Sequence, residues 1–105
     1  MPGTDGEAQV TIGRGAIYLP AALVARYFAG IEGVILLWRE ERIVIMPVRH
    51  LAGGGYLLKL RNSRGDRVVQ AADFFLDHGI DGETERQPAA SWRTDWAGLV
   101  LDSAN

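Results

Sequence analysis

Cysteine is absent from the 105 residues of the chain, which excludes disulfide bonds, thiol nucleophiles and thiolate metal sites. The only histidines are His50 and His78, and without cysteine they do not form a recognisable zinc or iron set. No serine lies at a strand-to-helix elbow of the kind that hydrolases use, and no glycine fingerprint for nucleotides occurs. We therefore expect a binding or regulatory protein that is not an enzyme and has no cofactor.

The chain also has little net charge, −2 at pH 7. This argues against a dedicated nucleic-acid binder, since duplex binding draws on Lys and Arg side chains that displace counterions. The distribution of charge is uneven, however. Residues 49–80 carry five basic and three acidic side chains, whereas residues 81–105 carry two basic and five acidic ones. An anionic partner should therefore meet the middle of the chain.

Long hydrophobic runs are missing as well. The first seven residues are polar and acidic, unlike a secretory signal or a membrane anchor. We expect residues 1–7 to form a disordered leader, and the protein to be cytoplasmic with no membrane partner. The 48% of hydrophobic residues and the 13 glycines fit one small domain of mainly β structure with short helices.

The stretch 8–48 predicts two strands, a short helix and a hairpin. Pro20 suits the first turn of the helix, and Gly30 supplies its stop. The hairpin consists of Val34–Trp38 and Ile43–Met46 around a charged turn. Its first strand is apolar on both faces, so both faces should be covered. Either a dimer partner or the second half of the chain can cover them.

Within this stretch, Gly15 to Pro20 precedes the helix, and Gly30-Ile31 precedes the hairpin. This order resembles the swapped-hairpin family of bacterial transition-state regulators, the AbrB/MraZ/MazE group, although Ala16 stands where the family signature usually has arginine. The resemblance implies an AbrB-like swapped-hairpin barrel made by a homodimer with interleaved hairpins. It also implies a DNA-binding transcription regulator, with Arg14 and Arg26 of the signature region as DNA contacts.

A second β-hairpin-helix unit is expected over residues 56–80, after a glycine-rich linker at 49–55. Its strands are Tyr56–Arg61 and Arg67–Gln70, joined by a glycine-containing turn, and a short helix follows. Its basic side chains are further candidates for contacts with DNA phosphates: Lys59, Arg61, Arg64 and Arg67. The alternative for these residues is a solvated strand face and turn.

The two units share a weak internal echo. Each has a strand and a helix that ends in Gly-Ile, at Gly30-Ile31 and at Gly79-Ile80. The residues after Ile80 show no pattern of a second hairpin. Shared helix-capping chemistry therefore explains the echo better than an internal duplication does.

Residues 81–105 predict an acidic and partly ordered tail. Trp92 and Trp96 are four positions apart, a spacing that suits one face of a short helix, and Leu99 extends the stripe. The stripe can pack on the chain itself, on a dimer mate or on another protein. The alternative to DNA binding is therefore a protein-interaction module, such as an antitoxin or an assembly factor. Such a module would bind its partner through its sheet and the segment Trp92, Trp96 and Leu99.

Overall fold

The computed structural model describes residues 9–51 and 53–102, and the expected leader lies outside these ranges. In chain order the elements are β1 (Thr11–Gly13), β2 (Ala16–Leu19), α2 (Ala21–Tyr27), β3 (Gly33–Arg39), β4 (Arg42–Val48), β5 (Tyr56–Leu57), β6 (Lys59–Leu60), β7 (Arg67–Gln70), α3 (Ala72–Asp77), β8 (Ala90–Arg93), the 3-10 helix η1 (Thr94–Trp96) and β9 (Gly98–Leu101). The expectation of a mainly β protein with short helices is confirmed.

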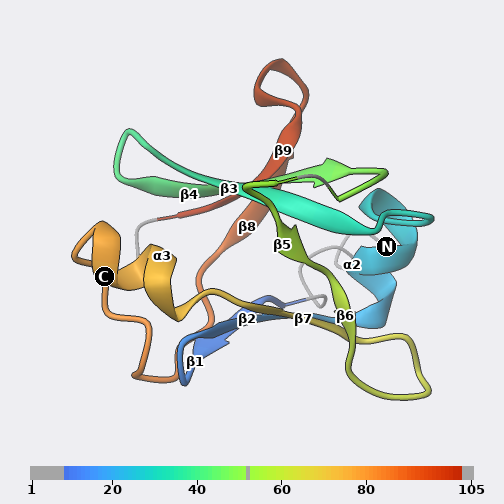
Figure 1. Ribbon diagram of the computed structural model, residues 1–105, viewed down its shortest axis with the longest axis horizontal. Coiled ribbons are helices and arrows are strands. Elements are labelled where there is room, and N and C mark those ends of the chain that lie inside the picture. Colours follow the sequence, from blue (N-terminus) through green and yellow to red (C-terminus); the bar gives the residue numbers. More distant parts are fainter. Residues whose placement is uncertain (1–8, 52, 103–105) are drawn as a thin grey trace.

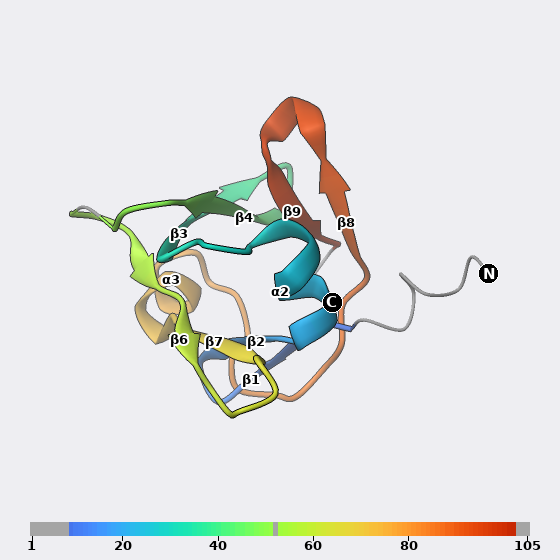
Figure 2. The same cartoon turned by 90° about the vertical axis from the view of Figure 1, so that its right-hand side faces the viewer.

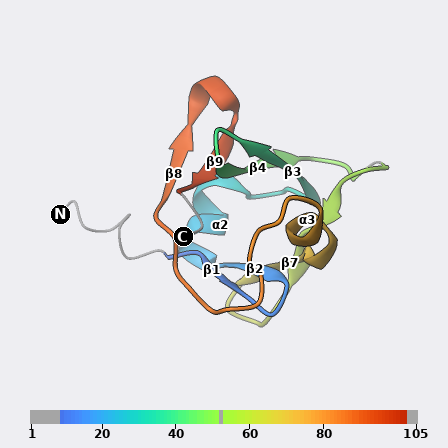
Figure 3. The ribbon, with the colours of Figure 1, turned by 90° about the vertical axis from the view of Figure 1, so that its left-hand side faces the viewer.

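The strands form two antiparallel sheets that enclose one core (Figure 1). Sheet A has the order β1-β2-β7-β6, and sheet B has the order β5-β3-β4-β9-β8. Seen from its two sides, the molecule shows α2 and α3 at opposite ends of the space between the sheets (Figures 2 and 3). The helices thus close a two-layer sandwich, which is one stable way to bury apolar sheet faces.

Local sequence signals account for most of these elements. The β1–β2 turn places Arg14 at φ 54° and Gly15 at φ 75°, the positive values that a two-residue turn needs to match the twist of its strands. Helix α2 begins directly after Pro20, as expected, and Gly30 has φ 73°. The β3–β4 hairpin also forms as expected, with its turn at Glu40 and Glu41.

The core follows strand alternation. Along β3, Val34 and Leu36 are buried in the main cluster, while Leu37 between Leu36 and Trp38 is 40% exposed. The cluster draws on both sheets and both helices, and it includes residues of β7, α3 and β9. The inner face of β3 is therefore covered by the second half of the same chain, which is one of the two possibilities that its apolar pattern left open.

The two halves of the chain take matching places in both sheets. The hairpin β1–β2 and the pair β6–β7 meet through the β2–β7 ladder in sheet A. The hairpins β3–β4 and β8–β9 meet through the β4–β9 ladder in sheet B. A helix links the two sheets in each half. The sequence-based view that no second hairpin follows Ile80 is wrong, and the internal echo extends through the whole fold.

Two further expectations need correction. The strand expected over Tyr56–Arg61 is split at Leu58, which is buried, so that β5 joins sheet B and β6 joins sheet A. The expected closed barrel is also wrong, because two open sheets form. Leu58 carries the chain from sheet B to sheet A, and no ladder joins the two sheets within the described residues.

The tail forms strands where the tryptophan spacing predicted a helix. Trp92 lies on β8, Trp96 on η1 and Leu99 on β9. Ala97 at φ 53° turns the chain back after η1. The helical spacing of the tryptophans is overridden by the pairing of β9 with β4. This pairing places Leu99 in the core. Within the described residues, no helix is long and apolar enough to cross a membrane.

Replacing Phe28 by Ala tests whether the layer between the sheets is the core. Phe28 is 1% exposed and is the largest of the fully buried side chains. We expect its removal to lower the free energy of unfolding by about 3–5 kcal/mol, measured by urea denaturation. Leu76→Ala is the matched control, because Leu76 is 81% exposed and should contribute less than about 0.5 kcal/mol. Equal losses for the two variants would contradict this core.

Candidate nucleic-acid interface

The outer face of sheet A carries a row of four side chains, three of them polar, that crosses all four strands. Thr11 pairs with Tyr18, Tyr18 with Val68, and Val68 with Lys59. Residues directly opposite each other in a ladder point to the same face. The next row, in which Leu19 pairs with Arg67, points inward, since Leu19 is buried in the core. The first row therefore lies on the outer face, where Lys59 is exposed, Thr11 and Tyr18 are half-buried and Val68 is buried.

Arg61 lies over this row. Its guanidinium carbon is 4.7 Å from the centre of the Tyr18 ring, within the range of a cation–π contact. The backbone N–H of Arg61 donates to the carbonyl of Asp66 at 2.8 Å, which holds the end of β6 beside β7. The arginine comes from the second unit and the tyrosine from the first, so the β2–β7 ladder brings them together.

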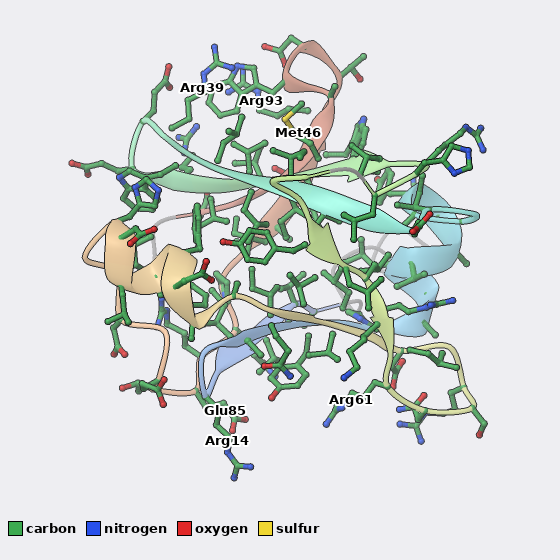
Figure 4. The ribbon with its side chains drawn as sticks, in the orientation of Figure 1. Arg14, Arg39, Met46, Arg61, Glu85 and Arg93 are labelled. Atoms are coloured by element: carbon green, nitrogen blue, oxygen red, sulfur yellow. The ribbon has the colours of Figure 1, made fainter. Side chains whose placement is uncertain are left out.

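Arg14 completes the basic face. Together with Arg61 it lines one hollow of about 330 Å³, whose other walls are Thr11, Gly13, Tyr18 and Glu85. Arg14 and Arg61 both lie on the side of sheet A that faces away from sheet B, and Glu85 lies beside Arg14 (Figure 4). The residues that line the hollow thus carry two guanidinium groups, two hydroxyl groups and one carboxylate.

Glu85 reaches the hollow because the segment after α3 runs along the free edge of β1. Ile12 and Arg86 exchange backbone hydrogen bonds of 2.8 and 2.9 Å, and the N–H of Gly15 donates to the carbonyl of Gly82 at 2.7 Å. No local pattern in the sequence predicts this edge pairing. Sequence reasoning also missed Tyr18 and Thr11, although the alternation of Tyr18 with buried neighbours was a usable signal.

The loop beside the hollow is ordered by Asp66. Its carboxylate accepts hydrogen bonds from the side chain of Asn62 at 2.9 Å, from the backbone N–H of Ala21 at 2.7 Å and from Arg64 at 3.1 Å. The bond to Ala21 satisfies a free N–H at the start of α2, as a capping side chain does. The hydrogen bonds from Asn62, Ala21 and Arg64 lower the pKa of Asp66 to about 2. The loop of the second unit is thereby tied to the helix of the first.

The other predicted DNA contacts do not join the hollow. Arg26 lies in the last turn of α2, 5.4 Å from the Tyr27 ring. Arg64 forms an ion pair with Asp66 in the loop. Arg67 faces the inner side of sheet A, where it donates to the carbonyl of Leu58 at 3.4 Å. Of the predicted set of six, Arg14 and Arg61 line the hollow, and Lys59 lies on the same face of sheet A outside it.

The three residues predicted to bind a partner pack within the chain. Trp92 stacks on Tyr27 with ring centres 4.8 Å apart. Trp96 is 9% exposed and packs on the outer face of sheet B, and Leu99 is 1% exposed in the core. Packing on the chain itself was one of the possibilities for this stripe.

The fold and this face define a class: a two-layer antiparallel β protein whose one sheet presents arginine and lysine around a tyrosine. No cluster of histidine, aspartate and glutamate that could hold a metal ion occurs within residues 9–51 and 53–102. Comparison of the chain with protein-family models, with curated proteins and with solved structures finds no match. The function is therefore inferred from the geometry of the site.

The Asp66 network predicts a loss of stability in acid. The carboxylate has an ordinary pKa of 3.8, and about 2 in the folded protein. Its contribution is fully present above pH 3.8 and is lost as the pH falls through 2, because the unfolded state takes up the proton first and the folded carboxylate, once protonated, no longer accepts its hydrogen bonds as an anion. In urea denaturation over this range, Asp66→Ala should be less stable than the wild type at neutral pH, and the difference should shrink in acid. A difference that stays constant with pH would contradict this assignment.

Proposed function

We propose that the protein is a small DNA-binding regulator that contacts the phosphate backbone with the outer face of sheet A. The observation that carries the proposal is the shared hollow of Arg14 and Arg61, with the Tyr18 ring under one guanidinium. Arginine side chains match the geometry of phosphate oxygens, and hydroxyl groups supply further donors. Lys59 adds a third positive charge in the same row.

The uneven placement of charge supports this orientation. Exposed carboxylates gather on α3 and in the segment after it: Asp73, Asp77, Asp81 and Glu83. A polyanion approaching the protein is repelled by the carboxylates of α3 and attracted to the arginines on the outer face of sheet A. The net charge of −2 is compatible with a basic contact surface, because two arginines and one carboxylate, Glu85, line the hollow.

Contacts of this kind position a duplex without reading its sequence. Arg14 and Arg61 extend from a turn and from a strand end, and both are exposed. No helix is among the elements that line the hollow. We therefore propose binding that depends strongly on salt and only weakly on base sequence.

The resemblance to the swapped-hairpin family bears on the proposal, but for one chain and not for two. We propose that the two halves of this chain occupy the places that two chains occupy in a swapped-hairpin dimer. The matching ladders β2–β7 and β4–β9 support this reading. An interleaved homodimer is then not needed to complete the core, and association of two copies becomes a separate question.

The double variant Arg14→Glu/Arg61→Glu tests the proposal. Each phosphate contact that is lost should reduce the slope of log affinity against log salt by about 0.9, so the double variant should lose about 1.8. Affinity should fall similarly for all duplexes. The measurement is fluorescence anisotropy of several labelled duplexes over a salt series.

Arg26→Glu/Arg49→Glu is the matched control. It makes the same change in net charge at two exposed residues that do not line the hollow. Its salt slope should remain close to that of the wild type. An equal fall in both double variants would indicate a general charge effect. A wild-type protein that binds no duplex at low salt would refute the proposed function.

A further inference from the structure

One carboxylate, that of Glu85, belongs to the residues that line the hollow on sheet A. The same hollow holds Arg14 and Arg61, so its lining has two positive charges and one negative charge. The side chain of Glu85 is exposed, so its carboxylate has no part in the core. A phosphate that enters the hollow is attracted by the arginines and repelled by Glu85.

Backbone hydrogen bonds on both sides hold Glu85 beside β1. Before it, the carbonyl of Glu83 accepts from the N–H of Arg14 at 3.2 Å. After it, Arg86 and Ile12 exchange two bonds, of 2.8 and 2.9 Å. Glu85 therefore keeps its place at the edge of sheet A through backbone contacts alone.

The turn that precedes Glu85 is ordered as well. The carboxylate of Asp81 accepts hydrogen bonds from the backbone N–H of Glu83 at 2.9 Å and from that of Thr84 at 3.2 Å. An aspartate that bonds the backbone two residues further on is a common way to fix a turn. The approach of the chain to Glu85 is thereby set by a side chain outside the hollow.

The side chain of Glu85 packs over a position that has no side chain. A Cβ added to Gly13 would lie 3.5 Å from the Cβ and 3.7 Å from the Cγ of Glu85. These are ordinary van der Waals contacts, so the glutamate covers the space that the glycine leaves open. Glu85 thus extends across the end of β1 to the hollow.

The opposite charges around the hollow do not neutralise one another by direct pairing. Within residues 9–51 and 53–102, Glu85 forms no ion pair with Arg14 or Arg61. The formal charge of the lining residues is +1, from two arginines and one glutamate. An anion in the hollow therefore meets a carboxylate that no arginine has already bound.

We propose that Glu85 limits how tightly the outer face of sheet A holds a polyanion, because it repels the phosphate that binds Arg14. Figure 4 places Glu85 next to Arg14, with Arg61 further along the same side of the sheet. Since the repulsion falls with distance, it acts mainly at the Arg14 end of the hollow. A phosphate backbone thus passes over Arg61 with little opposition and reaches Arg14 against the carboxylate.

This inference rests on the proposed function, because it concerns an anion bound to the same face. It adds a residue that opposes binding to two residues that favour it. A like charge at the rim of a contact lowers affinity and changes its dependence on salt. Glu85 is therefore a specificity-determining residue, since a ligand must gain enough from both arginines to offset its repulsion.

Glu85→Gln removes the charge and retains the shape of the side chain. Its affinity for a labelled duplex, measured by fluorescence anisotropy at low salt, should rise about two- to fivefold. The gain should shrink as salt screens the charges. Glu41→Gln is the matched control, because Glu41 is exposed in the β3–β4 turn and does not line the hollow. Equal gains for the two variants would indicate an effect of net charge and would overturn the proposal.

Arg14→Gln tests whether Glu85 acts at the Arg14 end of the hollow. In this background, Glu85→Gln should raise the affinity less than it does in the wild type, because no phosphate is then held beside the carboxylate. An equal gain in both backgrounds would contradict the proposed place of the repulsion. Circular dichroism verifies that all variants are folded.

The outcomes separate the role of Glu85 from the proposed function. If the wild type binds a duplex and Glu85→Gln binds it no more tightly, only the role of Glu85 is refuted. If neither protein binds a duplex at low salt, both proposals fail. If the variant binds and the wild type does not, the role of Glu85 is upheld, and the proposed function is refuted for the native chain.

Discussion

Two ladders between the halves of the chain, β2 with β7 and β4 with β9, are the constraint on which the rest of the structure depends. Each joins segments that are far apart in the sequence, so each costs loop-closure entropy before its contacts form. Burial offsets that cost, because Ile43, Ile45, Leu99 and Leu101 meet across the β4–β9 ladder and are almost completely buried. The helices and the loops pack on a frame that these ladders define.

The same frame creates the candidate site. Tyr18 and Arg61 belong to different halves, and they meet only because Tyr18 pairs with Val68 of β7, beside which β6 lies. Asp66 provides a second tie between the halves through its bond to the start of α2. A change that loosens the β2–β7 ladder should therefore disturb the core and the basic face together.

The outer faces of the two sheets carry different kinds of side chain, which the overall composition does not reveal. Sheet A turns lysine, arginine, tyrosine and threonine to solvent, whereas the centre of sheet B turns isoleucine, leucine and methionine outward. Carboxylates lie mainly on α3, in the segment after it and at the β3–β4 turn. The net charge of −2 is a sum over the whole chain, so it does not give the local charge of any one surface. Surfaces of different chemistry thus coexist on one small protein.

The sequence by itself determined the local elements, because turns, caps and strand alternation depend on neighbouring residues. Pro20 and Gly30 marked the limits of α2, and alternation separated the faces of the β3–β4 hairpin. The sequence also named six candidate DNA contacts, of which Arg14, Lys59 and Arg61 lie on the outer face of sheet A. Only the tertiary structure decided which elements meet: the tail became β8 and β9, Arg67 turned inward, and Glu85 reached the hollow. Alternation assigns a side chain to a face, but the neighbour across a ladder depends on long-range pairing, which no local pattern encodes.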